Sequence, residues 1–300
     1  LFMAFRASGL ISLSSDMLQT DRTLALPNGI FNPQDAAWLA GQSRYVVSSY
    51  FDSELVVYDQ MGTQATTWDL SELDAGGTMM DSDPEISGLL VDGDYVLANL
   101  QRLSGFSPME DSALAVVDTQ NDTVVDVDPM KSGTQPLVLP GKNSFGGLVR
   151  TGTGNMAVGL TGQFGMQDGK ITLVERKAAG DYEVGDTVVS ESDLGGDLSD
   201  FVMLDDELGF ALVSGMKDGA YVTELKFFSA AGGAVTVEDV TDVENASGAM
   251  CLTPDRSQVW VADGAMGSQG FWGIDVQTRM AVNSSPFPPT SGAPRSCVIR

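Results

Sequence analysis

A unit of about fifty residues recurs five times along this chain, and the repeat restricts the fold more than any other feature. Each copy opens with a short apolar stretch, passes through a Gly- or Asp-containing turn into a Val- and Ala-rich stretch, and continues with two further strand-like segments. The copies begin near positions 36, 87, 146, 199 and 247. Four short strands in a unit of this length are typical of a propeller blade, so the sequence predicts an all-β fold.

The two ends of the chain look like two parts of one further unit. Residues 1–27 contain three strand-like segments, and residues 293–300 supply one opening strand. An open array of blades would leave two bare sheet edges, and pairing the two ends removes them. We therefore predict one six-bladed β-propeller domain of four-stranded blades, closed by a blade shared between the N- and C-termini. The expected blades are residues 1–27 with 293–300, 34–80, 85–140, 144–194, 197–243 and 245–290.

Net charge and the missing histidines exclude several classes of function. The chain has 41 acidic and 16 basic residues and a net charge of −25. A chain this negative is repelled by phosphate backbones, so we expect no nucleic-acid partner. No run of about 18 apolar residues occurs, so we expect no direct membrane span. Without histidine, Ser-His-Asp and Cys-His catalysis and imidazole-ligated metals are excluded, which leaves carboxylates and hard cations.

The start of the chain and its cysteines indicate an exported protein. Residues 1–6 lack the basic and apolar regions of an intact signal peptide, so we expect a trimmed chain with an export signal or lipid anchor upstream. The expected location is periplasmic, cell-surface or extracellular. The chain's two cysteines are Cys251 and Cys297. Their offset on consecutive opening strands favours two buried free thiols over a disulfide.

Two stretches resemble a known bacterial repeat. Residues 252–263, which read LTPDRSQVWVAD, are similar to the core of bacterial YVTN-type propeller repeats. Residues 115–125 resemble the other half of the same repeat. The resemblance implies a β-propeller in an exported or surface protein and no particular catalysis. The units of this chain are longer than the family's repeat.

One set of positions carries polar side chains at the same place in successive units. Two residues before each opening strand lie Gln34, Glu85, Ser144, Asp197 and Asn245, with Ala293 in the sixth unit. The loop leading into the innermost strand lies at one mouth of a propeller's central channel, so we expect a ring of oxygen atoms there. The ring resembles that of six-bladed calcium-dependent lactonases, which implies possible calcium at Glu85, Asp197 and Asn245. A wet, polar channel mouth accounts for the same residues without a cofactor.

Functions from different classes fit these features. The first is an exported non-catalytic propeller that binds a protein partner or serves as a scaffold in an envelope or surface assembly. Recognition would then lie in variable loops such as 104–112 and 180–196. The alternative is a calcium-dependent hydrolase of lactones or esters that uses the axial ring. A redox quinoprotein is a third reading with less support, and we expect the first function, without catalytic residues.

Overall fold

The structure, a computed structural model, resolves the chain into antiparallel sheets and two compact units. The described residues are 2–5, 10–14, 20–25, 32–74, 83–105, 107–243, 246–264 and 270–286. The units are residues 1–148 with 174–184, and residues 149–173 with 185–300.

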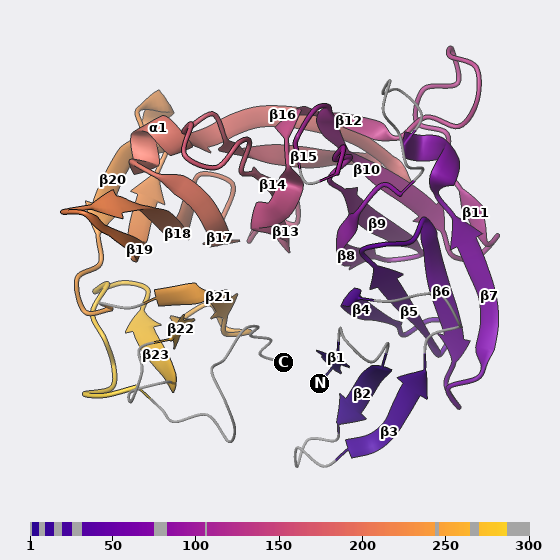
Figure 1. The fold of residues 1–300 in the computed structure, drawn as a ribbon, viewed down its shortest axis with the longest axis horizontal. Helices are drawn as coiled ribbons and strands as arrows, with labels where there is room; N and C mark the ends of the chain where they lie inside the picture. The colour runs from indigo at the N-terminus through magenta and orange to yellow at the C-terminus, as the bar shows by residue number, and fades with distance from the viewer. Residues whose placement is uncertain are drawn as a thin grey trace. The chain divides into compact units, whose positions relative to one another are not determined.

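The described residues form six sheets, three of them with strands from the first part of the chain (Figure 1). The first sheet contains β1 (Phe2–Phe5), β2 (Leu10–Ser14) and β3 (Thr20–Ala25) in that order. The second contains β4 (Pro33–Leu39), β5 (Arg44–Ser49), β6 (Glu54–Asp59) and β7 (Gln64–Asp69). The third contains β8 (Ile86–Asp92), β9 (Tyr95–Leu100), β10 (Asp111–Asp118) and β11 (Thr123–Val124), and β12 (Leu137–Lys142) also pairs with β10.

The other three sheets follow the same consecutive order. The fourth contains β13 (Gly147–Arg150), β14 (Met156–Leu160), β15 (Lys170–Ala178) and β16 (Asp181–Ser190). The fifth contains β17 (Asp197–Met203), β18 (Leu208–Lys217), β19 (Ala220–Ser229) and β20 (Thr236–Asp239). The sixth contains β21 (Ala246–Leu252), β22 (Gln258–Asp263) and β23 (Gly270–Asp275).

The sheets lie where the repeat predicts strands. β4, β8, β13, β17 and β21 begin at residues 33, 86, 147, 197 and 246, beside the expected repeat starts. Each is the first strand of its sheet and pairs with the strand that follows it in the chain. The all-β class is therefore confirmed, and among the described residues the second, fourth and fifth sheets are meanders of four strands. The count of six blades and their closure stay predictions, because residues 293–300 lie outside the described residues.

Helices are short in the described residues. They are α1 (Glu191–Leu194) and the 3-10 turns η2 (Ser71–Asp74), η3 (Ser144–Gly146) and η4 (Ala231–Gly233). α1 has a complete capping box, in which Ser190 and Asp193 each accept the other's backbone N–H. Among the described residues no helix is both long and apolar enough to cross a membrane.

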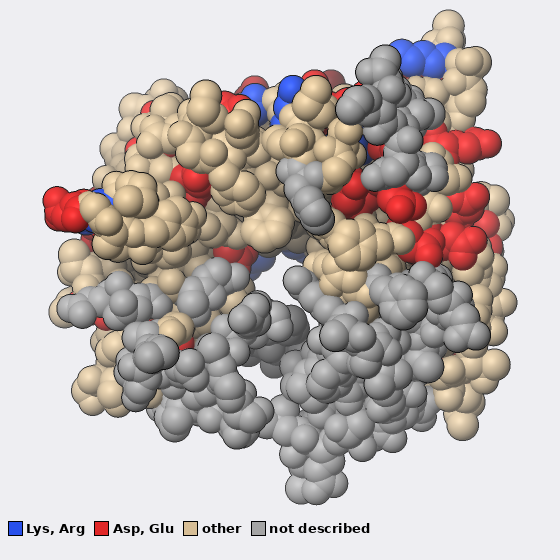
Figure 2. Space-filling model, viewed as in Figure 1, with Lys and Arg blue, Asp and Glu red and all other residues tan. Residues whose placement is uncertain are grey.

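The core of each unit comes from the middle strands of the sheets. β9 and β14 are buried along nearly their whole length, as expected for strands covered on both faces. Side chains of the first unit's core include Val46, Val57, Val96, Ala98 and Val117, and those of the second include Phe201, Phe210, Leu212, Phe228 and Val261. Carboxylates are more prominent than cations on the face seen in Figure 2, in line with the net charge.

Two aspartates join the first strand of one sheet to the first strand of the next. Oδ2 of Asp35 in β4 accepts the backbone N–H of Leu89 in β8 at 2.9 Å. Oδ2 of Asp200 in β17 accepts that of Met250 in β21 at 2.6 Å. Burial raises the pKa of Asp35 to about 6 and that of Asp200 to about 7, although backbone N–H donors partly offset the rise. These carboxyls connect neighbouring sheets within each unit.

Candidate functional site

Glu85 lies just before β8 and holds the loop that follows β9. Its side chain is buried, and its backbone has the left-handed φ of 44°. Oε2 accepts the backbone N–H of Leu103 at 2.7 Å, and the Glu85 carbonyl accepts that of Gln101 at 3.3 Å. Glu85 is therefore a clamp on the β9–β10 loop.

Ser144 belongs to a buried polar network in the first unit. Its N–H donates to Oγ of Ser112 at 3.0 Å, and its carbonyl oxygen accepts from Nδ2 of Asn99 at 2.7 Å. Oδ1 of Asn99 and Nε2 of Gln101 are buried without a hydrogen-bond partner in the protein. Buried polar atoms of this kind are places where ordered water binds. The network is consistent with a wet polar region beside the start of β13.

Asp197 lies at the start of β17 and holds the loop between β14 and β15. Its side chain is 5% exposed, and Oδ2 accepts the backbone N–H of Gly165 at 2.7 Å. Oδ1 is buried with no hydrogen-bond partner in the protein. Asp197 and Glu85 thus act alike, since each accepts a backbone N–H from the loop between the second and third strands of a sheet.

Glu191 is a buried carboxyl beside Asp197 that the sequence reasoning missed. Oε1 accepts the N–H of Leu198 at 2.6 Å, and Oε2 accepts that of Gly169 at 2.8 Å. Burial raises the pKa of Glu191 to about 7, the two N–H donors lower it, and the carboxylates of Asp197 and Asp168 raise it further. In the sequence, Glu191 lies within a capping signature, Ser190 followed three residues later by Asp193, which indicates the start of a helix.

The structure leaves the complete ring of five positions untested. Gln34 is half-buried in β4, and Asn245 lies outside the described residues. Glu85 and Ser144 belong to the first unit and Asp197 to the second. No group of three or more Asp, Glu or Cys side chains among the described residues is arranged to hold a metal ion. The calcium site at Glu85, Asp197 and Asn245 therefore stays a prediction.

Six of the exposed large apolar side chains lie on the hairpins and loops between second and third strands. They are Phe51 in the second sheet, Met109 in the third, Phe164 and Met166 in the fourth, and Met216 and Tyr221 in the fifth. In an antiparallel meander these loops lie at the same end of the sheet as the start of the first strand. None of the described turns between first and second strands carries an exposed large apolar side chain. Other large apolar side chains are exposed outside these loops, among them Met61 between β6 and β7, Met130 between β11 and β12, and Met280 after β23.

In the second unit two of these loops are neighbours. Asp197 accepts from Gly165, at the centre of the loop that exposes Phe164 and Met166. Asp197 is also paired with Ser214 in β18, and the chain continues from Ser214 into the β18–β19 hairpin.

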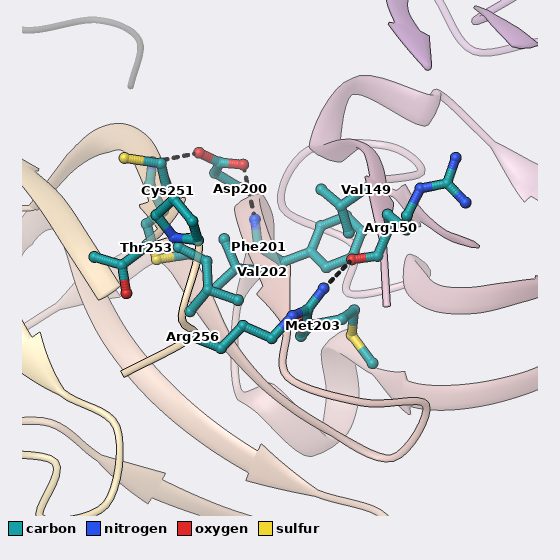
Figure 3. Close-up of a pocket in the computed structure, with 12 residues that line it drawn as sticks. Val149, Arg150, Asp200, Phe201, Val202, Met203, Cys251, Thr253 and Arg256 are labelled. Carbon is teal, nitrogen blue, oxygen red and sulfur yellow. Dashed lines mark hydrogen bonds between the residues drawn. The ribbon is translucent and has the colours of Figure 1, made fainter. Parts of the chain in front are cut away.

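A pocket of about 360 Å³ lies toward the other end of the first strands of the second unit (Figure 3). It is lined by β13, β17, β21 and the turn after β21, with Arg150, Asp200, Thr253 and Arg256 as its polar residues among others. Nη1 of Arg256 donates to the carbonyls of Met203 and Leu204, and Nη2 donates to that of Arg150.

The chemistry available in this pocket is limited. Both Asp200 oxygens accept backbone N–H groups, from Phe201 and Met250, and the raised pKa allows proton exchange near neutral pH. The Arg256 guanidinium is used by three backbone carbonyls. Oγ1 of Thr253 donates to Asp255. These polar groups mainly organise the backbone.

Cys251, which also lines the pocket, corrects the expectation of free thiols. It is disulfide-bonded, and no described cysteine is free. The other cysteine of the sequence, Cys297, lies outside the described residues. The prediction assumed regular alternation along the opening strand, whereas the pairing of β21 with β22 shifts register between Ala246 and Met250, just before Cys251.

Comparison with known proteins shows the fold and nothing narrower. No family model and no curated protein matches the chain. Hydrazine synthase of Kuenenia stuttgartiensis is similar in structure, with a TM-score of 0.69, 13% identity, and coverage of 98% of this chain and 84% of that chain. A Bacteroides fragilis protein provisionally assigned as a 6-phosphogluconolactonase has a TM-score of 0.61 and 13% identity, with 98% of this chain and 85% of that chain covered. The Neurospora crassa Pan2 WD40 domain has a TM-score of 0.58 and 8% identity, with 93% of this chain and 74% of that chain covered.

These similarities define the class of protein. The neighbours are propeller-type proteins, so this chain has a β-propeller type of fold. Identities of 8% to 14% do not carry function from any of them to this chain. Membership of the YVTN-type repeat family stays a prediction.

Proposed function

We propose that this chain is an exported, non-catalytic β-propeller that binds a protein partner through the loops between the second and third strands of its sheets. The observation that carries the proposal is the set of exposed apolar side chains on these loops. Phe164 is 56% exposed and Met166 is 63% exposed, on a loop held by Asp197. Exposed aromatic and Met side chains on an anchored loop are typical of protein-binding surfaces.

The buried carboxylates at the same end of the sheets support binding over catalysis. Glu85 and Asp197 each direct an oxygen to a loop N–H, so they position loops. The net charge of −25 favours a partner with a basic surface. The disulfide at Cys251 supports an oxidising compartment and therefore export.

The test compares matched surface variants. The wild-type chain and the variant Phe164→Ser/Met166→Ser are each immobilised and exposed to extracts of the source cells. The proteins that the two retain are then compared. The control is Met61→Ser/Met280→Ser, because these methionines are also exposed but lie outside the loops in question. We expect a partner that the wild type and the control retain and the loop variant loses. Identical retention by all three proteins would contradict the proposal.

The alternative, a calcium-dependent hydrolase of lactones or esters, has one observation in its favour. Glu191 lies beside Asp197 of the predicted ring, and burial raises its pKa to about 7, which suits acid–base work. If calcium binds the predicted ring, it raises the melting temperature of the wild type and of Asp218→Asn but not of Glu85→Gln. Our main proposal predicts equal responses in all three proteins and no lactone hydrolysis.

A further inference from the structure

The β18–β19 hairpin extends beyond the sheet to which it belongs. The two strands pair without interruption from Leu208 with Ser229 to Lys217 with Ala220. β17 accompanies β18 only as far as Ser214, which pairs with Asp197. Residues 215–222, which we call the finger, therefore form a two-stranded projection. Its turn consists of Asp218 and Gly219, with φ of 52° and 83°, as in a type I′ hairpin turn.

The β19 edge of this hairpin is open in the described residues. β20 pairs with β19 only over Lys226–Ser229, and the N–H of Val240 donates to the carbonyl of Leu225 at 2.9 Å. No described strand pairs with residues 220–224 on that side. The row of backbone groups there is a ready template for another strand.

The hairpin register identifies which groups point outward. A two-residue turn closes on a hydrogen-bonded pair, here Lys217 with Ala220, and bonded pairs then alternate along the ladder. Ala220 and every second residue after it bond to β18, so Tyr221, Thr223 and Leu225 direct N–H and C=O to the open side. The bond from Val240 to Leu225 on that side agrees with this assignment.

The finger also presents an apolar pair beside the open edge. Met216 and Tyr221 are directly opposite in the register, so their side chains lie on the same face. They are 71% and 64% exposed. A neighbouring strand paired with Tyr221 would cover this face with its own side chains.

We propose that the open edge of β19, at Tyr221 and Thr223, binds an extended basic peptide segment of a partner protein by β-strand addition. The inference rests on the proposed protein-binding function and specifies how the partner docks. Backbone hydrogen bonds supply the pairing, and the Met216–Tyr221 pair receives an apolar side chain of the added strand.

Charge favours a basic strand. Lys217 is paired with Glu224, whereas Asp218 at the finger tip has no ion pair among the described residues. The chain as a whole carries −25. A Lys or Arg beside the apolar residue of the incoming strand complements the tip.

The experiment uses a random linear peptide library displayed on phage and panned on the folded chain. Selected peptides are synthesised, and their affinities are measured for wild type, Thr223→Pro, Met216→Ser/Tyr221→Ser, Phe164→Ser/Met166→Ser and the control Met61→Ser. Proline at position 223 removes an outward N–H without removing a backbone bond to β18, and edge strands tolerate it there. It also removes the hydrogen bond between the Thr223 and Ser214 hydroxyls, so the melting curve of this variant is compared with that of Thr223→Val. Circular dichroism melting confirms that each variant is folded.

We expect Thr223→Pro and the double serine variant each to weaken binding about tenfold or more. Met61→Ser should bind as the wild type does. N-methylation of the peptide should abolish binding at alternate residues only, because successive N–H groups of a strand point to opposite sides.

Other outcomes separate this inference from the proposed function. Binding that depends on Phe164 and Met166 but is unchanged in Thr223→Pro overturns strand addition and leaves the protein-binding loops standing. An absence of selected peptides overturns strand addition alone, and the protein-binding function is then decided by the retention experiment.

Discussion

Asp200 and Met250 connect the first strands of two neighbouring sheets through one hydrogen bond, in which Oδ2 of Asp200 accepts the backbone N–H of Met250 at 2.6 Å. Asp35 and Leu89 repeat the same link between β4 and β8 in the other unit. In each case Oδ1 accepts the N–H of the next residue, so both carboxyl oxygens are used by the backbone. The same link therefore occurs in two places in the chain, once in each unit.

Stability should fall as the pH rises from about 4 to about 7. Burial raises the folded-state pKa of Asp200 to about 7 and that of Asp35 to about 6, from 3.8 for both, so the folded state binds protons more tightly than the unfolded state. The stabilisation is complete below the unfolded pKa and is lost as the pH passes the folded pKa. Thermal melting across this range measures the slope.

The variant Asp200→Asn isolates one of these groups. It keeps the side-chain shape and removes the titration, so the fall in melting temperature between pH 4 and 7 should become shallower. The control is Asp218→Asn, which removes a carboxylate at an exposed turn. An unchanged slope in Asp200→Asn would show that this carboxyl does not titrate in that window.

Asp197→Ala should loosen the loop that carries Phe164 and Met166. The change removes the acceptor for the N–H of Gly165, and a lost hydrogen bond to a charged group costs about 1.5 to 3 kcal/mol. Asp197→Asn should cost less, because its amide oxygen still accepts from Gly165 and its charge no longer opposes Glu191. Limited proteolysis at residues 162–168 should be fastest in Asp197→Ala. Equal cleavage of both variants and the wild type would contradict the clamp.

The strands were predictable from sequence because their signal is local. In the sequence, the third unit has an apolar run at Met156–Leu160 that coincides with β14, and the first unit has a run at Tyr45–Tyr50 that differs from β5 by one position at each end. Both strands are mostly buried, so runs rich in Val and Ala indicate their position in the sequence. The repeat added the order of the strands, because consecutive strands of a meander pair with each other.

The roles of the polar residues were less predictable. Glu85 and Asp197 were expected to be site residues from their position in the repeat. Their partners are the backbone N–H groups of Leu103 and Gly165, and any residue type other than proline supplies such a group, so the sequence does not indicate which residues they bind. The links made by Asp35 and Asp200 were not predicted from the sequence. Gly88 occupies the comparable position in β8, so a polar residue does not repeat there.

The disulfide prediction concerns Cys251, which is bonded. We expect mass spectrometry of the unreduced protein to show Cys251 joined to Cys297. In the chain-entropy account, closing the long loop between these positions stabilises the fold by about 4 kcal/mol. Reduction should therefore lower the melting temperature of the wild type and leave Cys251→Ser/Cys297→Ser unchanged. Labelling of both cysteines by iodoacetamide without reductant would contradict the bond.

Arg256 should stabilise the fold by connecting the ends of neighbouring strands. Its guanidinium donates to the carbonyls of Met203 at 2.8 Å, Leu204 at 2.9 Å and Arg150 at 3.4 Å, which joins the turn after β21 to the ends of β17 and β13. Arg256→Met leaves these carbonyls without their donors and should cost about 1 to 3 kcal/mol of unfolding free energy.

A lysine at the same position separates geometry from charge. Arg256→Lys keeps the charge, but one ammonium group lacks the planar fork that reaches carbonyls on two sides, so it should restore only part of the loss. Gly152→Ala should disturb the same connection, because a Cβ there would lie 2.1 Å from the Leu204 carbonyl oxygen and 3.2 Å from Nη1 of Arg256. Denaturant unfolding of the three variants measures the costs. Inorganic phosphate or acetate that stabilises the wild type but not Arg256→Met would show instead that the guanidinium is free to bind an anion.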